Sequence, residues 1–130
     1  RVFVGEKEYQ SLSVIIASGA SARLMGLDSE KRLIGHGVST CAVCDGAFYR
    51  NKKVVVYGND LEAIEDALML KQLGCEVTLI SHCKKVKCPE KLRETAAAKG
   101  IEMLPDTRIK SIQGDSSVER IVIENSEGGA

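Results

Sequence analysis

The stretch Val54-Val55-Val56-Tyr57-Gly58-Asn59-Asp60-Leu61-Glu62-Ala63 decides the fold. It passes from a run of β-formers into a glycine turn and then into the start of a helix. Apolar residues recur at helical spacing through Ile64 and Leu68 up to Gly74, where the helix is expected to stop. The stretch therefore predicts a strand buried on both faces, a turn and a helix, which together form the first half of a βαβ unit.

The segments that follow continue the alternation of strands and helices. Residues 76–81 and 101–104 are typical of strands, and residues 89–99 are typical of a helix that Pro89 opens and Gly100 closes. This order implies right-handed crossovers and a parallel sheet with helices on its faces. Residues 107–113 and 118–124 flank a polar turn and predict a hairpin appended to the sheet. We therefore predict an α/β fold, a Rossmann-like three-layer domain with a central parallel sheet, crossover helices and an appended antiparallel hairpin.

The patterns at the two ends of the chain are weaker. Residues 1–4 and 10–16 are expected to form short strands around a polar turn, and residues 21–38 carry three glycines without a clean period and predict a connecting loop. Residues 126–130 resemble a frayed end or a linker. A start inside a hairpin suggests that the chain was cut from a longer polypeptide.

Composition narrows the class of function. The 130 residues suit one domain, and 18 basic side chains balance 18 acidic ones, so no global field favours nucleic acid or an anionic membrane. Aromatic residues make up only 4%, which argues against a base-stacking surface, and the apolar runs are too short to span a bilayer. Five cysteines without a secretory signal point to the cytosol.

The glycine turn can be compared with the dinucleotide-binding fingerprint G-x-G-x-x-G/A. Gly58 and Ala63 match its first and last positions, whereas Asp60 replaces the middle glycine. Two like charges about 4 Å apart repel by roughly 4 kcal/mol at an effective dielectric near 20, so Asp60 is expected to weaken diphosphate binding. Asn59 as N-cap with Glu62 at the third helical position would instead resemble a capping box. A weakened nucleotide site and a purely structural turn both remain open.

In dinucleotide-binding domains, a residue at the end of the second strand normally binds the adenosine ribose. Here the strand continues as Ser81-His82-Cys83-Lys84-Lys85-Val86-Lys87, without a carboxylate or an arginine. The three lysines could attract a phosphate as point charges, or they could form a solvated loop before the next helix.

The pair Cys41 and Cys44, followed at once by Asp45, has the spacing of a reversible disulfide. In such a C-x-x-C motif one thiolate attacks, the other resolves the mixed disulfide, and a nearby acid can protonate a leaving thiolate. Two alternatives are half of a zinc site and two structural thiols. Zinc needs two further ligands, and the remaining candidates are scattered, so we predict no metal: Cys75, Cys83, Cys88, His36 and His82.

The run from Gly37 to Asn51, which contains Cys41-Ala42-Val43-Cys44-Asp45-Gly46 and leads directly into the first strand, resembles the low-molecular-weight thioredoxin reductase family. Ala17-Ser18-Gly19-Ala20-Ser21-Ala22-Arg23 also resembles the segment where the flavin domain of that family passes into its nicotinamide domain. The resemblance covers nearly the whole chain, and the C-x-x-C-D-G block is specific to this family and its close relatives.

This resemblance implies a disulfide oxidoreductase that passes electrons from NADPH through FAD to the dithiol and on to thioredoxin. It implies that Cys41 attacks the thioredoxin disulfide, that Cys44 faces the flavin, and that Asp45 is the acid–base residue. Residues 1–22 would be a remnant of the flavin domain, with Ser18, Gly19 and Ala20 on the FAD side, and residues 23–130 the nicotinamide domain. The full-length protein would be a cytoplasmic homodimer, and this piece alone would be inactive.

The nucleotide motifs of the family are altered in this chain. Its turn G-G-G-N-T/S-A falls on Gly58-Asn59-Asp60-Leu61-Glu62-Ala63, and its H-R-R-x-x-x-R element falls on Ser81, His82 and Cys83, with Lys87 at the last position. One alternative is therefore a flavoenzyme of the same family with a donor other than NADPH, such as ferredoxin. Another is a non-enzymatic module, either a thiol redox sensor or a degenerate Rossmann domain used for protein contact.

Overall fold

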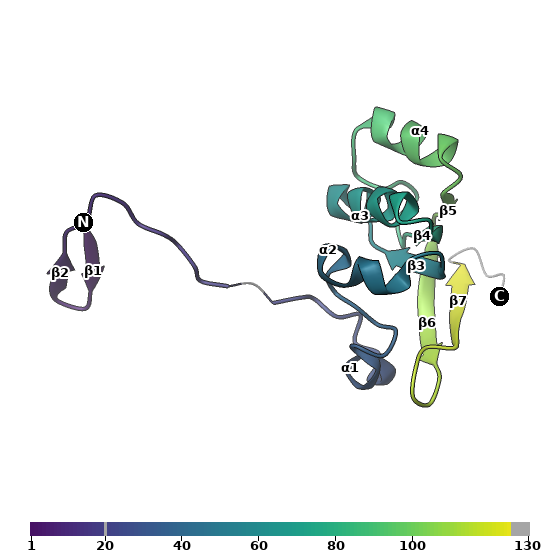
Figure 1. Cartoon of the computed structure of the whole chain (residues 1–130), viewed down its shortest axis with the longest axis horizontal. Coiled ribbons are helices and arrows are strands. Elements are labelled where there is room, and N and C mark those ends of the chain that lie inside the picture. Colours follow the sequence, from purple (N-terminus) through teal and green to yellow (C-terminus); the bar gives the residue numbers. More distant parts are fainter. Residues whose placement is uncertain (20, 126–130) are drawn as a thin grey trace.

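A computed structural model describes residues 1–19 and 21–125 (Figure 1). The expected frayed end at residues 126–130 lies outside the described residues. The elements follow the order β1 (Val2–Val4), β2 (Lys7–Tyr9), α1 (Asp28–Leu33), α2 (Ala42–Asp45), the 3₁₀-helix η1 (Gly46–Tyr49), β3 (Lys53–Tyr57), α3 (Leu61–Gln72), β4 (Glu76–Ile80), α4 (Glu90–Ala98), β5 (Glu102–Leu104), β6 (Thr107–Gln113) and β7 (Arg120–Asn125).

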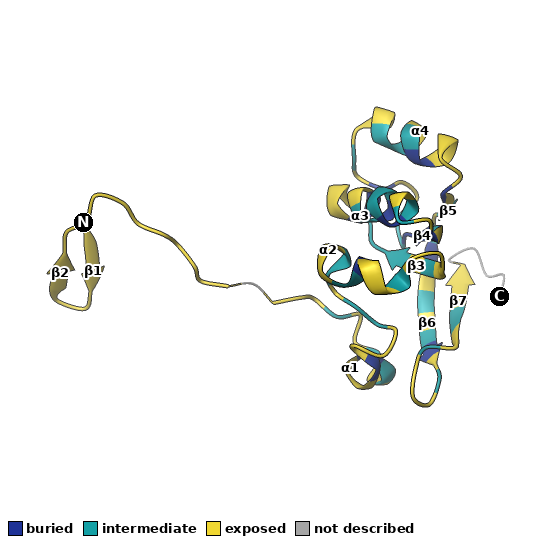
Figure 2. Ribbon diagram, in the orientation of Figure 1, coloured by how far each residue is buried: buried dark blue, intermediate teal, exposed yellow. Residues whose placement is uncertain are grey.

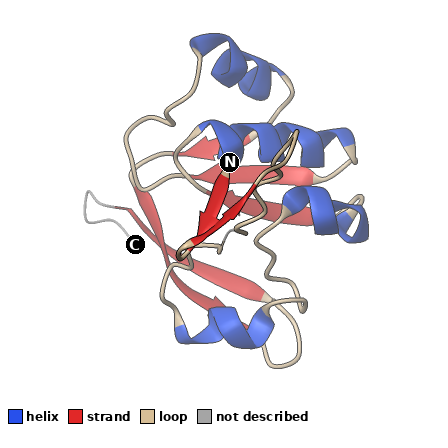
Figure 3. Cartoon of the chain, turned by 90° about the vertical axis from the view of Figure 1, so that its left-hand side faces the viewer, coloured by secondary structure: helices blue, strands red, loops and turns tan. Residues whose placement is uncertain are grey.

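A parallel sheet in the order β3-β4-β5 forms the centre of the fold. Val54 lies opposite Val77, and Ile80 of β4 lies opposite both Tyr57 and Leu104. The predicted βαβ order, the parallel sheet and the α/β class are thus confirmed. In Figures 1 and 3, α4, α3 and the parallel strands follow one another, and the hairpin β6–β7 and α1 lie at the opposite end of the body.

The sequence predicted that β3 is buried on both faces, but the strand with this burial is β4. Val55 of β3 is 42% exposed, whereas Val77, Leu79 and Ile80 of β4 are buried. The reason is topological, because β4 has a strand on each side and β3 pairs with β4 alone among the described strands. The run of valines in β3 therefore reflects β-propensity at an edge of the described sheet.

Helix α3 supplies the main face of the core (Figure 2). Its buried residues Ala63, Ile64, Ala67 and Leu70 recur at helical spacing and pack with residues of β4 and α4. Ile64 has no exposed surface, and full burial of such a side chain stabilises a fold by about 1.5–3 kcal/mol. The helix ends at Gln72 and is followed by Gly74 at φ +82°, as the sequence predicted.

Gly58 is needed at the close approach of β3 and α3. A Cβ atom on Gly58 would lie 2.6 Å from the Cβ of Ala63, which is far inside van der Waals contact. This glycine therefore allows the strand and the helix to pack closely.

The expected loop at residues 21–38 contains a short helix, α1. The carboxylate of Glu30 accepts hydrogen bonds from the backbone N–H groups of Met25, Gly26 and Leu27 at 2.7–2.8 Å, which satisfies donors ahead of the helix. Leu33 is 1% exposed and anchors the helix on the body. Helix α1 is too short to show the helical period in the sequence, and the glycines around it are typical of a loop.

The expected second strand at residues 10–16 is also wrong, because β2 spans Lys7–Tyr9 and pairs with β1. Leu12, Ile15 and Ile16 are more than four-fifths exposed, and residues 10–16 pair with no strand in the part of the chain that the structure describes. An apolar run without a partner strand has no backbone partners that would hold it in a sheet.

The predicted hairpin is present as a separate two-stranded sheet with a bulge between Ile109 and Ser111. It is joined to the parallel strands through Ser81, whose carbonyl accepts from the N–H of Thr107 at 2.9 Å. Its far end contacts the α1 region, since the Arg32 side chain donates to the carbonyl of Asp115 at 2.6 Å. None of the described helices is long and apolar enough to cross a membrane.

Replacing Gly58 by alanine is expected to destabilise the fold by about 1–3 kcal/mol, because the new methyl group overlaps Ala63. Urea unfolding of Gly58→Ala, Ala63→Gly and the double variant measures this effect. We expect the double variant to lose less than the sum of the two single losses, because Ala63→Gly removes the clashing atom. Additive losses would show that the contact does not explain the glycine.

Replacing Asp66 by asparagine is expected to stabilise the fold at neutral pH. Burial raises the pKa of the Asp66 carboxyl, and Glu62, Glu65 and Asp60 raise it further. A raised folded-state pKa means that the protonated form contributes stability below the unfolded pKa, near 3.9, which is lost as pH rises through the folded pKa. We expect Asp66→Asn to gain about 0.5 kcal/mol at pH 7 and nothing at pH 3, as measured by melting at both values. An equal gain at both pH values would exclude the charge as its cause.

Candidate functional site

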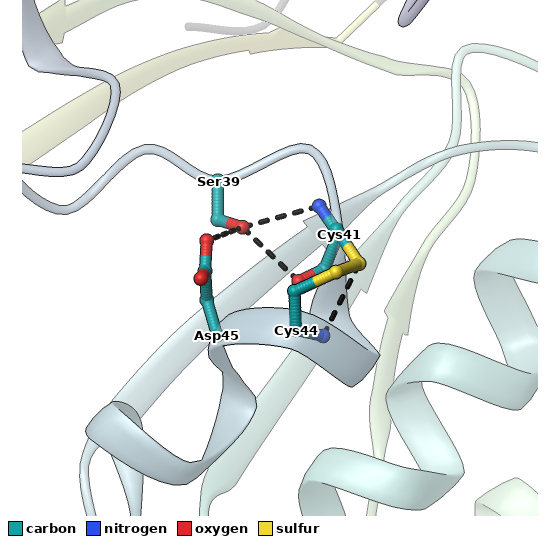
Figure 4. Close-up of a disulfide and its surroundings, with 4 residues drawn as sticks. All are labelled: Ser39, Cys41, Cys44 and Asp45. Carbon is teal, nitrogen blue, oxygen red and sulfur yellow. Dashed lines mark hydrogen bonds between the residues drawn. A yellow bond between two sulfur atoms is a disulfide. The ribbon is translucent and has the colours of Figure 1, made fainter. Parts of the chain in front are cut away.

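The two cysteines of the C-x-x-C motif form a disulfide at the start of α2 (Figure 4). Cys41 is the N-cap of this four-residue helix, and its Sγ accepts a hydrogen bond from the N–H of Cys44 at 3.1 Å. Cys41 is partly buried, whereas Cys44 is exposed. A sulfur that accepts a backbone N–H at a helix N-terminus is in an environment that favours its thiolate when the pair is reduced.

Asp45 lies beside this disulfide and is held by Ser39. The Ser39 hydroxyl donates to Asp45 Oδ2 at 2.6 Å and accepts from the N–H of Cys41 at 3.1 Å. It also lies 3.2 Å from the carbonyl of Cys41, but a hydroxyl has only one proton, and the shorter bond to a carboxylate is the stronger. Ser39 thus connects the carboxylate of Asp45 to the backbone of Cys41.

Sequence reasoning missed Ser39. The signal was present, because a serine two residues before Cys41 can bond to a nearby backbone N–H, as serine commonly does at turns and helix starts.

The dithiol segment rests on the carboxyl-terminal half of α3. Gly46 is buried, and a Cβ there would lie 3.1–3.2 Å from side-chain atoms of Met69, Leu70 and Leu73. In addition, the thiol of Cys75 donates to the carbonyl of Tyr49 at 3.1 Å. The glycine of the C-x-x-C-D-G block therefore brings the dithiol helix against α3.

The turn between β3 and α3 differs from the expected capping box. The N-cap is Asp60, whose Oδ1 accepts from the N–H of Ala63 at 3.2 Å, and the expectation that Asn59 would fill this position is wrong. Glu62 consequently lies one position earlier than expected, within the first turn. The reason is that Asp60 has the extended backbone of an N-cap, so the helix begins one residue later.

Asn59 connects the turn to the loop after β4. Its side-chain amide donates to Cys83 Sγ at 3.3 Å and lies 3.5 Å from His82 Nε2. Its backbone carbonyl accepts from the N–H of Lys87 at 2.7 Å. Ser81 is buried, and its hydroxyl accepts from the N–H of Cys83 at 3.1 Å. The structure thus brings together residues that the sequence placed in two separate nucleotide motifs.

Arg93 of α4 holds the same loop from the other side and was not singled out from the sequence. Its guanidinium donates to the carbonyls of Val86 at 2.9 Å and Cys88 at 2.6 Å and pairs with the carboxylate of Glu90. The hydrogen bond from Arg93, with one from Lys85, lowers the pKa of Glu90.

Two further candidates, Ser18 and Gly19, lie apart from these two regions. Ser18 and Gly19, expected on the FAD side, are exposed in an extended segment, and Ala20 lies outside the described residues. Cys75, Cys83 and Cys88 are free thiols. Within residues 1–19 and 21–125, no three His, Cys, Asp or Glu side chains gather in a way that could hold a metal ion.

Comparison with known proteins agrees with this arrangement of a dithiol on an α/β domain. The sequence profile for pyridine nucleotide-disulphide oxidoreductases matches residues 2–129. The chain belongs to this family. A thioredoxin reductase of Mycolicibacterium smegmatis is 38% identical over 98% of the chain and 42% of its own length. The thioredoxin reductase of Streptococcus pyogenes, a solved structure, matches with a TM-score of 0.80 at 34% identity over 85% of the chain and 37% of its own.

A solved ferredoxin-flavin thioredoxin reductase of Clostridium acetobutylicum is also similar, with a TM-score of 0.61 and 25% identity. The match covers 78% of this chain and 33% of that protein. The predicted resemblance to thioredoxin reductases and the predicted fold are thus confirmed. The chain spans about two-fifths of the length of the relatives that it matches.

Replacing Ser39 by alanine is expected to cost about 1–2 kcal/mol of folding stability, because the bond from its hydroxyl to a carboxylate is lost. Urea unfolding of the oxidised chain measures the loss, and Thr40→Ala, at the exposed neighbouring position, is the matched control. Equal stabilities for the two variants would mean that the Ser39 bonds contribute nothing to the dithiol segment.

Proposed function

We propose that Cys41 and Cys44 are the redox-active pair of a thioredoxin reductase-type flavoprotein, of which residues 23–130 form the nicotinamide-type domain and residues 1–22 part of the flavin domain. The observation that carries the proposal is the Cys41–Cys44 disulfide beside Asp45 at the start of α2. The identities to thioredoxin reductases over nearly the whole chain support it.

The proposed exchange begins from the reduced pair. The Cys41 thiolate attacks one sulfur of the thioredoxin disulfide, and the other sulfur of thioredoxin leaves as a thiolate that Asp45 can protonate directly or through water. Asp45, now ionised, accepts the proton of the Cys44 thiol. The Cys44 thiolate then attacks Cys41 Sγ, and the second thioredoxin sulfur leaves as a thiolate that takes up this proton. Thioredoxin gains two electrons and two protons, and Cys41 and Cys44 return to the disulfide. The N–H of Cys44, which already bonds to Cys41 Sγ, stabilises the attacking thiolate.

Re-reduction requires two electrons, which FAD supplies in the full-length protein when it is bound. The described residues do not enclose such a cofactor, because Ser18 and Gly19 lie in an exposed extended segment. We therefore infer that the isolated domain is inactive.

We also infer a cytoplasmic homodimer for the full-length protein. Three thiols remain free within the described residues, which suits a reducing compartment. The homodimer follows from the resemblance to the family. Gel filtration of the longer protein and fractionation of cells test these two inferences.

The source of the electrons has two candidates. NADPH is the donor that the family resemblance implies, and a reduced carrier such as ferredoxin is the alternative. The alternative is favoured by Asp60 at the glycine turn and by the similarity to a ferredoxin-flavin thioredoxin reductase. Anaerobic titration of the flavoprotein with NADPH, NADH and reduced ferredoxin, followed by flavin bleaching, separates them. Rapid bleaching by micromolar NADPH would exclude the alternative.

A non-enzymatic redox sensor is the other class of function. Equilibration of the chain in glutathione buffers from about −320 to −180 mV, followed by alkylation, locates the potential of the pair. A pair that never forms a disulfide in this range would exclude redox chemistry. A pair that cycles but never exchanges with thioredoxin would favour the sensor.

A trapping experiment tests the proposed roles of the cysteines. Reduced Cys44→Ser is expected to accumulate a mixed disulfide with oxidised thioredoxin through Cys41, because the thiol that completes the exchange is missing. Reduced Cys41→Ser is expected to form at least about tenfold less adduct. Mass spectrometry under non-reducing conditions measures both, and Cys83→Ser, which removes a free thiol elsewhere, controls for incidental exchange. Adduct mainly in Cys41→Ser would reverse the assignment.

A further inference from the structure

The turn between β3 and α3 has the layout of a dinucleotide site, but a backbone N–H that would bind the nucleotide is already bonded to a side chain of the turn. The N–H groups at the start of a helix such as α3 are those that bind a diphosphate. Here the carboxylate of Asp60 accepts from one of them, the N–H of Ala63, at 3.2 Å. A fixed negative charge therefore stands where the middle glycine of a fingerprint would leave room for phosphate.

The remaining glycine of the fingerprint serves packing. A Cβ at Gly58 would strike the Cβ of Ala63 at 2.6 Å, so the absence of a side chain is accounted for by the contact between strand and helix. The glycine is therefore not a sign of a phosphate approaching the backbone.

The path between the turn and the loop after β4 is bridged by the Asn59 side chain and by a backbone bond. The Asn59 side-chain amide donates to Cys83 Sγ at 3.3 Å and lies 3.5 Å from His82 Nε2, and the Asn59 backbone carbonyl accepts from the N–H of Lys87 at 2.7 Å. The ring of His82 in turn lies 6.1 Å from that of Tyr57 at the end of β3. These contacts join the two motifs that would have to lie on either side of a bound dinucleotide.

Arg93 fixes the loop in this closed position. Its side chain is only 15% exposed and donates to the carbonyls of Val86 and Cys88, and Val86 itself is buried at 6% exposure. Because opening the loop would break these bonds and expose Val86, the closed form is a packed part of the domain.

The electrostatic field at the start of α3 disfavours an anion. Asp60, Glu62, Glu65 and Asp66 lie on its first two turns, and the first three carboxylates, together with burial, raise the pKa of Asp66. Of the loop lysines, Lys85 is already paired with Glu90 at 3.0 Å.

We propose that the β3–α3 turn is a closed, self-capped joint and that this domain does not bind a pyridine dinucleotide there. Asn59 and Asp60 are the residues that close it, Asn59 by joining the turn to the loop and Asp60 by its charge at the helix start. A reductant for the dithiol must therefore dock elsewhere. The inference concerns binding alone, so it is independent of the thiol chemistry proposed above.

The test uses ¹⁵N-labelled chain titrated with NADPH and NADH, with the amide signals of Gly58 and Ala63 as the readout. The wild-type chain is expected to show no saturation up to about 1 mM. In Asn59→Gly/Asp60→Gly both closing side chains are removed, and glycine is tolerated at an N-cap, so the fold is retained. This variant is expected to bind at least about tenfold more tightly.

Two further variants separate the effect of the Asp60 charge on nucleotide binding from the effect of its N-cap hydrogen bond. Asp60→Asn keeps a side-chain cap and removes the charge, and we expect it to bind more tightly than the wild type but less tightly than the double glycine variant. Glu65→Gln removes a charge from the same helix farther from the turn, and its gain in affinity is expected to be smaller than that of Asp60→Asn. Spectral dispersion checks the fold of each.

Saturable wild-type binding below about 1 mM, with shifts at Gly58 and Ala63, would overturn the proposal. Equal failure of folded wild-type and double glycine variants to bind would overturn the assignment of the closure to Asn59 and Asp60. The exchange of Cys41 with thioredoxin, measured in the same samples, reports separately on the proposed function.

Discussion

The contact between α3 and the parts of the chain around it is the constraint on which the rest of the structure depends. At its start, Ala63 lies so close to Gly58 that no side chain fits at that position. Its middle buries Ile64 and Ala67 in the core. Near its end, Leu70 packs on Gly46 below the dithiol. One helix therefore positions the glycine turn and the cysteine pair, and it does so through apolar contacts that do not depend on the chemistry of either site.

The two ends of this helix differ in how their polar groups are used. At the dithiol, the backbone N–H of Cys44 points to Cys41 Sγ, and Ser39 links the carboxylate of Asp45 to the same cysteine. These hydrogen bonds converge on atoms that could change charge during exchange. At the turn, by contrast, Asp60 uses a helix N–H in a fixed internal bond. Such a group is already satisfied, so a ligand anion has to displace it before it can bind.

Much of the fold could be predicted because its signals were local. The run of valines, the glycine turn and the helical spacing after it gave the first βαβ unit, and the later strands and hairpin followed from their own patterns. Of two expectations that failed, one depended on strand pairing across the chain and the other on local hydrogen bonds that leave no periodic pattern. Val55 is exposed because β3 has a single partner among the described strands, and α1 forms because Glu30 caps it from within.

The site was predictable to a similar depth. Cys41, Cys44 and Asp45 could be found because their spacing is a motif. The signal at Ser39 was only the general preference of serine for helix starts, and Arg93 donates to backbone carbonyls that no motif marks. The N-cap was misplaced by one residue because Asn59 and Asp60 both have side chains suited to the position, and local preference could not choose between them. The choice depends on the loop after β4, which occupies the Asn59 amide and leaves Asp60 to cap the helix.

This division explains how the nucleotide motifs can be altered while the dithiol is intact. The supports of the dithiol are Ser39, Gly46 and the far half of α3, and none of them contacts Asn59 or Asp60 in the hydrogen bonds and close contacts described above. Substitutions at the turn are therefore expected to leave the cysteines in place, because effects of well-separated sites without shared partners are nearly additive. The two regions share only the apolar face of α3, which positions both the glycine turn and the dithiol segment. This face consists of Ala63, Ile64, Ala67 and Leu70, and its burial is needed for both regions.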